Sequence, residues 1–440
     1  MDKNALKQKI FSAIEDRKQE IKDLSLYLWD HPELGYKEKE GTKKVAEFLG
    51  NLGLETTENL AVTGCQAQLE GKEPGKVVAV MGELDAIVCP DHECCDKETK
   101  AVHACGHHLQ VGVMAGVALG LAASGVMDQL TGSVRFMAVP AEEFIELSFR
   151  SGLRQEGSIR YFGGKQELIA KGYLDDVDLA VMMHALSLSD NGKVLIGPKG
   201  NGFVGKEVRF IGQESHAGSA PEDGVNALNA AMIGLSAIHA QRETFKDEDR
   251  VRVHPMITKG GDIVNVVPAD VRLESYTRAR TVEAMVDANQ KVDRALKAGA
   301  LAVGAQVEIK DTCGYLPLLT NPDLDALTRQ NALELVGEEA ITDGGDFTGS
   351  FDFGDVSHLM PSLHPFIGGV KGALHTRDFE VTDFDTALIM PAKLLAATLV
   401  DLLADGGKEA DRITEAFVPV LSKEEYIALL EDLTKTTTFK

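Results

Sequence analysis

Three apolar segments of this 440-residue chain end at ionisable side chains. They are residues 76–81 ahead of Asp85, residues 132–139 ahead of Glu142 and Glu143, and residues 178–183 ahead of His184. Short apolar segments that alternate with longer helical ones are typical of an α/β fold with a mostly parallel sheet flanked by helices. Ligands bind beyond the carboxyl ends of the strands in such sheets. The pattern therefore predicts a polar site at one edge of a buried sheet.

Helical periodicity on either side of these segments supports the same fold class. Apolar residues recur at helical spacing over residues 4–30, which we expect to form one helix. His31 and Pro32 would end it. Further helices are expected over residues 38–52, 109–125, 323–336 and 384–403. The polar segment after residue 405 suggests no function.

The middle of the chain follows a different order of elements. Strand and helix patterns alternate over residues 202–212, 225–245, 251–259, 270–278, 282–303 and 306–312. Their βαββαβ order is that of the split ferredoxin-like unit. Because 440 residues exceed one ordinary core, we expect two domains. One is an inserted domain over residues 199–312, and the other is a discontinuous domain over residues 1–198 and 313–440.

Charge and composition exclude several classes of partner. The chain has 68 acidic and 45 basic residues, and its net charge of −23 repels nucleic-acid phosphates and anionic membranes. Its first residues lack the apolar core of a signal peptide. Residues 111–127 come nearest to a membrane span but fit a buried helix better. We expect a cytoplasmic protein with reduced thiols that binds no nucleic acid and no membrane.

A short histidine-rich and cysteine-containing segment, residues 103–108, opens the helix expected after the first strand. Thiolates and imidazoles are ligands for borderline-soft divalent metals, and a thiolate or carboxylate can bridge two of them. Two metals about 3.5–4 Å apart can hold a hydroxide and polarise a carbonyl. Five side chains of the chain could form such a paired site: Cys105, His107, Glu143, His184 and His375.

Two further carboxylates have expected roles beside these ligands. Glu142 could take the proton of the attacking water. Asp85 could orient a ligand imidazole or cap a helix. Each candidate also has a simpler interpretation when it is taken alone. A Glu-Glu pair is usually surface charge, His184 could be a hydrogen-bonded core residue, and His375 could be an exposed loop residue.

The chain resembles the M20 peptidase family of metal-dependent amidohydrolases, in particular its aminoacylase, hippurate hydrolase and aminobenzoyl-glutamate hydrolase branch. The matching motifs occur in the family's order and span nearly the whole chain. They are the segments at residues 31–35, 82–86, 103–107, 140–143, 183–184, 216–227, 260–268 and 374–376. This resemblance implies a dinuclear-metal catalytic domain with an inserted lid or dimerisation domain.

The resemblance also implies a role for each candidate residue. Cys105, His107, Glu143, His184 and His375 would bind two divalent ions, zinc or manganese or else cobalt or nickel, with Cys105 as the bridge. Glu142 would be the general base. His216 would stabilise the oxyanion, often in the active site of the partner subunit. Asn265 and Arg278 would hold the substrate carboxylate.

Two departures from the branch leave alternatives open. His108 follows the second ligand where the branch has Asp or Asn. It could orient a ligand from outside the metal site, contact the substrate or be an extra ligand. The loop over residues 90–96 carries vicinal cysteines, Cys94 and Cys95. They could bind a peripheral metal, sense oxidation or be incidental thiols of a solvent loop.

The expected activity is hydrolysis of the amide bond of N-acyl or N-aroyl amino acids or similar small conjugates. Two alternatives remain. One is a dipeptidase or carboxypeptidase of the same family, and the other is a catalytically silent binding protein with the same fold. The inserted domain predicts a homodimer, because its sheet edge and helix face suit isologous pairing.

Overall fold

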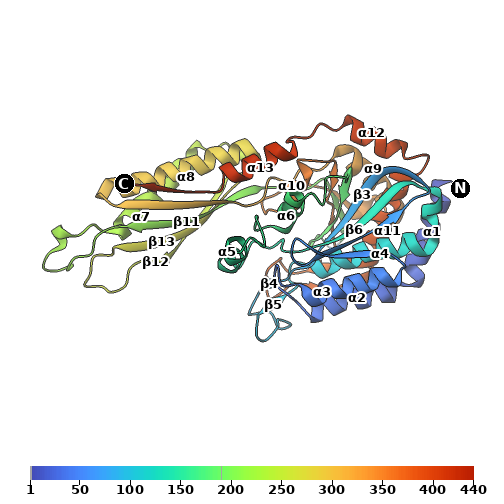
Figure 1. The fold of residues 1–440 in the computed structure, drawn as a ribbon, viewed down its shortest axis with the longest axis horizontal. Coiled ribbons are helices and arrows are strands. Elements are labelled where there is room, and N and C mark those ends of the chain that lie inside the picture. Colours follow the sequence, from blue (N-terminus) through green and yellow to red (C-terminus); the bar gives the residue numbers. More distant parts are fainter. Residues whose placement is uncertain (1, 190) are drawn as a thin grey trace. The chain divides into compact units, whose positions relative to one another are not determined.

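The computed structural model describes residues 2–189 and 191–440, which form two compact units (Figure 1). The first unit comprises Met1–Pro198, Leu319–Asp346 and Asp355–Val420. The second comprises Lys199–Leu318, Phe347–Gly354 and Leu421–Lys440. Residues 313–318, Phe347–Gly354 and Leu421–Lys440 were expected in the first domain but belong to the second unit. The C-terminal segment does so because strand β21 (Lys435–Phe439) pairs with β14 (Gln306–Cys313).

The first unit is built on a six-stranded mixed sheet. The four strands after its first two are parallel to one another, and the first two form an antiparallel edge. The central strands are buried along most of their length, which explains why they are continuous apolar segments in the sequence. The strand order is β1 (Thr56–Leu60), β2 (Gly64–Glu70), β6 (Thr131–Val139), β3 (Glu73–Glu83), β7 (Leu179–Val181) and β17 (Ser362–Leu363).

Shorter elements complete the first unit. A four-stranded sheet has the order β15 (Ile341–Asp343), β9 (Val194–Ile196), β18 (Phe366–Ile367) and β8 (His184–Ala185). Two strand pairs form small hairpins, β4 (Ile87–Val88) with β5 (Ala101–Val102), and β19 (Val370–Lys371) with β20 (Glu380–Val381). Other helices of this unit are α3 (Lys39–Asn51), α5 (Leu147–Gln155), α6 (Gly164–Lys171), α9 (Pro322–Val336) and α12 (Lys408–Ala416).

Helix α4 (His107–Ser124) lies at the centre of the first unit (Figure 1). It contacts β3 of the sheet, and α1 (Lys3–Asp16), α2 (Lys18–Asp30) and α11 (Met390–Leu403) pack around it. All its residues from His107 to Leu121 are buried, so it is apolar on every side. This burial places the first residue of α4, His107, inside the protein.

Glycines on α4 permit the close approach of its neighbours. A Cβ atom added at Gly120 would lie 2.7 Å from Ile14 Cγ1 and 2.8 Å from Ile10 Cγ2 of α1. At Gly116 it would lie 2.9 Å from Ala392 Cβ of α11. These distances are shorter than ordinary van der Waals contact, so α4 packs against both helices only because these positions lack a side chain.

One expectation for the helices was wrong. The single helix expected over residues 4–30 is two helices, α1 and α2, with a break at Arg17 (φ −120°, ψ 18°). The break lets both helices pack against α4. The expectation that residues 111–127 fit a buried helix is confirmed for residues 111–121, which are all buried in α4. Among the described residues one helix, Asp385–Leu403, has the length and composition of a span, and 89% of its apolar window is buried in the fold, as in a core helix.

The second unit is a five-stranded antiparallel sheet with two helices on one face (Figure 1). Its elements follow in the order β11 (Gly202–Ile211), α7 (Ala227–Gln241), β12 (Arg252–Lys259), β13 (Asp270–Ala279), α8 (Val282–Val303) and β14, with α13 (Lys423–Asp432) and β21 at the end of the chain. The apolar face packs under α7 and α8, and the other face exposes charged residues such as Glu207, Arg209 and Glu274. Alternation along the strands produces these two faces.

We predict that Gly120→Ala lowers the free energy of unfolding by about 1–2 kcal/mol, because overpacking against α1 outweighs the gain in helix propensity. Gly50→Ala is the matched control, since a Cβ at this helical position of α3 meets nothing within 4 Å. This control should stabilise the protein by up to about 1 kcal/mol. Urea unfolding of both variants measures the difference. Equal stabilisation by the two substitutions would contradict the packing argument.

Candidate metal centre

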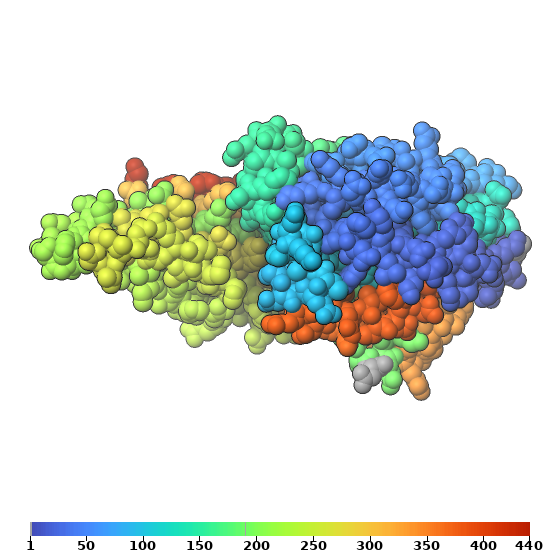
Figure 2. Space-filling view, turned by 90° about the horizontal axis from the view of Figure 1, so that it is seen from below, coloured from blue at the N-terminus to red at the C-terminus, as the bar shows by residue number. Residues whose placement is uncertain are grey.

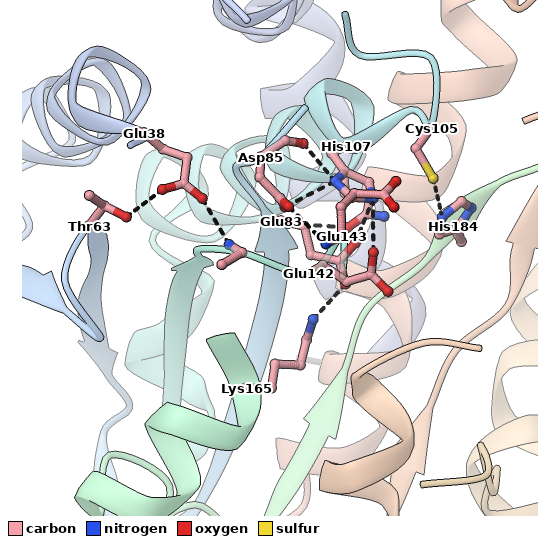
Figure 3. Close-up of polar contacts among 12 residues, drawn as sticks. Glu38, Thr63, Glu83, Asp85, Cys105, His107, Glu142, Glu143, Lys165 and His184 are labelled. Atoms are coloured by element: carbon pink, nitrogen blue, oxygen red, sulfur yellow. Dashed lines mark hydrogen bonds and ion pairs between the residues drawn. The ribbon is translucent and has the colours of Figure 1, made fainter. Parts of the chain in front are cut away.

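The parallel arrangement of β3 and β6 brings two polar segments of the first unit together. The backbone N–H of Leu84, just after β3, donates to the carbonyl of Val139 at the end of β6 (2.9 Å). Asp85 follows the first strand, and Glu142 and Glu143 follow the second. Figure 3 shows these carboxylates around the imidazole of His107, with Cys105 and His184 beside it. The expected site at the strand ends therefore gathers residues from five separate segments of the chain.

Five donor atoms form two overlapping groups in this cluster. The Sγ of Cys105 lies 3.5 Å from Nε2 of His184 and 3.2 Å from Nε2 of His375. The Oε1 of Glu143 lies 2.9 Å from Nε2 of His375. One group is Cys105, His107 and His184, and the other is Cys105, Glu143 and His375. Within each group the ligand atoms all lie within 4.8 Å of one another. Cys105 belongs to both, so its sulfur is placed where one atom could bridge two cations.

Hydrogen bonds orient two of the imidazoles toward the cluster. His107 Nδ1 lies 2.8 Å from the carbonyl oxygen of Asp85, and His184 Nδ1 lies 2.7 Å from that of Ala185. Because a carbonyl only accepts, each Nδ1 carries the hydrogen when the ring is neutral. Each Nε2 then presents its lone pair to the cluster, which is the arrangement of a metal-binding histidine.

The loop between β4 and β5 braces the segment that carries His375. The backbone of His375 has a φ of 64°, and its N–H donates to the carbonyl of Ala104 (2.9 Å). His92 of the loop accepts the N–H of Cys94 at Nδ1 and donates from Nε2 to the carbonyl of Phe379 (3.0 Å). Figure 2 shows the light-blue loop against the orange segment. The unusual loop therefore supports a candidate ligand.

The buried polar atoms of the cluster test whether a metal fits. Glu83 Oε2 and His107 Nε2 are buried and have no hydrogen-bond partner among the described residues. Buried polar atoms are rarely left without such partners. Nitrogen and sulfur ligands of zinc, about 2.0–2.1 Å and 2.3 Å from the ion, stand about 3.5 Å apart at a tetrahedral angle. The donor set and its spacing therefore fit divalent cations.

Electrostatic coupling among the donors is strong. Burial opposes ionisation of the Cys105 thiol, but the charges of His107, His184 and His375 hold its pKa well below the usual value. Burial also opposes the charge of His107, but Cys105 and Glu83 hold the pKa of this imidazole well above its usual value. Burial and the neighbouring Cys105 raise the pKa of Glu143 to about 7, against the effect of His375.

Hydrogen bonds from outside the cluster hold the turn after β6. Asp85 Oδ2 accepts the N–H of Glu143 (2.8 Å), so one aspartate positions both His107 and Glu143. Glu38 Oε1 accepts the N–H of Ala141 (2.8 Å), whose φ of 54° marks a strained turn. Arg150 donates to the carbonyl of Glu143. These contacts fix the turn so that the side chains of the adjacent residues Glu142 and Glu143 can point in different directions.

Four buried residues around the cluster were missed in the sequence analysis. They are Glu38, Glu83, Arg150 and Lys165. Glu83 had a signal, because it ends the same strand that precedes Asp85. Glu38 and Arg150 had none, because they come from other segments and meet the turn only in the folded chain. Burial and the charge of Asp85 raise the pKa of Glu38 to about 7.

Glu142 is buried beside the two donor groups and belongs to neither. Its Oε2 lies 3.8 Å from Nε2 of His107. His108 also stays outside these groups. Its ring packs against Trp29 (4.9 Å between centroids) and His103 (5.5 Å). Cys94 and Cys95 are not part of any potential metal-binding group found in the described part of the chain.

The other predicted site residues, His216, Asn265 and Arg278, lie in the second unit. Nδ1 of the exposed His216 accepts the N–H groups of Gly218 and Ser219, both at 3.1 Å. The carbonyl of Asn265 accepts the N–H of Ala217 (3.0 Å), so Asn265 lies next to His216. Separately, Arg278 donates from Nη1 to Ser350 Oγ (2.6 Å).

Comparisons with known proteins place the chain in a family. The chain is 27% identical to the mouse Xaa-Arg dipeptidase over 90% of its length and 89% of that protein. It is 24% identical to the N-acyl-L-amino acid amidohydrolase of Geobacillus stearothermophilus over 75% of its length and 86% of that protein.

A solved structure, a dinuclear metal binding peptidase of family M20 from Bacillus subtilis, shares the fold with a TM-score of 0.66 and 21% identity, covering 91% of this chain and 99% of that one. The sequence model of peptidase family M20/M25/M40 matches residues 79–401, a span that includes every candidate ligand. The chain therefore belongs to peptidase family M20/M25/M40 and is a metal-dependent hydrolase.

Proposed function

We propose that the chain hydrolyses the amide bond of N-acyl or N-aroyl amino acids or similar small conjugates, with two divalent cations as cofactors. The observation that carries this proposal is the pair of donor groups that share the Cys105 sulfur, with the Glu142 carboxylate beside them. Cys105, His107 and His184 would hold one cation, and Cys105, Glu143 and His375 the other. Thiolate, imidazole and carboxylate ligands suit zinc or manganese.

The cations would supply the Lewis acidity that polarises the scissile carbonyl and makes a water acidic. Glu142 would accept the proton of that water and return it to the leaving amine. Glu142 is 5% exposed and lies next to the donor atoms without belonging to either Cys105 group, as suits a residue that moves a proton rather than holding one of these cations.

We propose further that His216 stabilises the oxyanion. Its Nδ1 accepts two backbone N–H groups, so the neutral ring carries its hydrogen on Nε2. This tautomer presents a hydrogen-bond donor, which is what an oxyanion requires. Asn265 and Arg278 would bind the substrate carboxylate, as an amide and a guanidinium can. A homodimer formed through the second unit and a cytoplasmic location remain part of this proposal.

A dipeptidase is a second candidate, because the mouse Xaa-Arg dipeptidase aligns with 90% of the chain. The two activities differ in the group N-terminal to the scissile bond, an acyl group or an amino acid with a free amine. The sequence similarity does not favour one strongly over the other, since the N-acyl-L-amino acid amidohydrolase also aligns.

A substrate panel separates these candidates. We expect the metal-loaded protein to have a higher kcat/KM for N-acetyl and N-benzoyl amino acids than for dipeptides with the same C-terminal residue, arginine included. Higher values for the dipeptides would replace the proposed activity with the second candidate. Tight metal binding with no turnover of any panel member, in zinc, manganese, cobalt or nickel, would indicate a silent binding protein.

Glu142→Gln should keep both cations but lower kcat by about 10²-fold or more, because the amide has the same shape and cannot accept the proton. Metal content by elemental analysis and steady-state kinetics on the best substrate measure the two effects. Glu143→Gln is the companion variant, which should lose metal as well as activity. Unchanged turnover by Glu142→Gln would remove this residue from its role.

Cys105→Ala should reduce the number of bound cations and weaken those that remain, because it removes the shared ligand atom. Cys65→Ala is the matched control, a buried cysteine of strand β2 that belongs to neither donor group. Elemental analysis after equilibration with excess zinc and gel filtration measures the count. Two bound cations in Cys105→Ala would rule out a bridging thiolate.

A further inference from the structure

We propose that Glu83 is an additional metal ligand of this centre and that the buried Lys165 is the positioning residue that aims it. The inference rests on the proposed dinuclear centre and adds to it a carboxylate that the sequence analysis did not select. Glu83 ends strand β3, and Lys165 lies in the first turn of α6. Figure 3 shows Lys165 below the cluster, directed toward these carboxylates.

The two oxygens of Glu83 have different surroundings. Oε1 accepts a hydrogen bond from Nζ of Lys165 at 2.5 Å, and both side chains are essentially inaccessible to solvent. Oε2 is buried, and no described residue forms a hydrogen bond with it. A buried ion pair that is only structural normally has its remaining lone pairs satisfied by further hydrogen bonds. The lysine therefore holds the carboxylate while one oxygen remains open to a ligand.

The open oxygen faces the metal-binding nitrogen of His107. Glu83 Oε2 and His107 Nε2 lie 3.1 Å apart, and this nitrogen also lacks a hydrogen-bond partner. Because Nδ1 of the ring faces the carbonyl of Asp85, Nε2 of the neutral ring is an acceptor. When the ring is neutral, a divalent cation bound by both atoms would satisfy this buried pair. Oxygen and nitrogen ligands about 2.0–2.2 Å from one zinc ion stand about 3–3.5 Å apart, which agrees with the separation seen here.

A third donor group of the cluster supports the assignment. The ligand atoms of Glu83, His107 and Glu142 lie within 4.8 Å of one another, and all three residues are buried. Glu83 would therefore share a cation with His107. The charge of Lys165 offsets that of Glu83, so the carboxylate adds a ligand atom without adding a net negative charge to a centre already rich in anions.

The test compares three variants with the intact protein. Glu83→Gln removes the carboxylate charge, and the double variant Glu83→Leu with Lys165→Met removes the buried pair without leaving an isolated charge. Lys206→Met is the control for loss of a buried lysine, because Lys206 pairs with the buried Asp311 in the second unit at 2.6 Å. Circular dichroism and urea unfolding establish that each variant is folded.

The measured quantity is the dissociation constant of each zinc ion, from competition with a chromophoric chelator, together with the visible spectrum of the cobalt-loaded protein. We expect Glu83→Gln and the double variant to bind one of the two cations at least about 10-fold more weakly and to change the cobalt ligand-field bands. Lys206→Met should leave both constants and the spectrum unchanged. The readout does not depend on turnover.

The outcomes separate this inference from the proposed function. Unchanged zinc constants and cobalt bands in a folded double variant would overturn the role of Glu83 and leave a structural ion pair. If Cys105→Ala also retained two cations, the bridging thiolate of the proposed centre would fail as well. If Cys105→Ala lost metal while both Glu83 variants retained it, only the present inference would fail.

Discussion

The hydrogen bonds of Asp85 connect the parts of the candidate site. Its carbonyl accepts from Nδ1 of His107, and its Oδ2 accepts the N–H of Glu143. Asp85, which follows β3, thus sets the tautomer of the His107 imidazole on α4 and the direction of the turn after β6. These bonds are fully buried, so water does not compete with them. The rest of the centre depends on this arrangement, because it places oxygen, nitrogen and sulfur donors at metal-binding spacing.

The packing of helices around α4 in the first unit holds this polar centre in place. Helix α4 starts at His107, and the glycines at positions 116 and 120 let α1 and α11 close around it. A helix that is apolar on all sides can only be stable when it is surrounded. The same burial removes solvent from the donors, which strengthens their mutual interactions and makes unpaired atoms costly. A bound cation would relieve that cost.

Much of the site could be predicted from the sequence because its residues stand next to recognisable strand ends and motifs. Asp85, Glu142, Glu143 and His184 follow apolar segments, and the structure brings them together with Cys105 and His107. Other features could not be predicted. Glu38, Arg150 and Lys165 reach the centre from separate helices and loops, and the C-terminal strand β21 joins the second unit through pairing that periodicity does not encode.

The sequence by itself determined the fold class, the family resemblance and the identity of the ionisable side chains at the strand ends, because these follow from local periodicity and short motifs. Only the tertiary structure decided which donor atoms share a common point, that the thiol of Cys105 belongs to two groups, and that Lys165 holds Glu83 against His107. The physical reason is that long-range packing, rather than local spacing, sets the distances between side chains from separate segments. Those distances determine whether a cluster of charges can hold a metal.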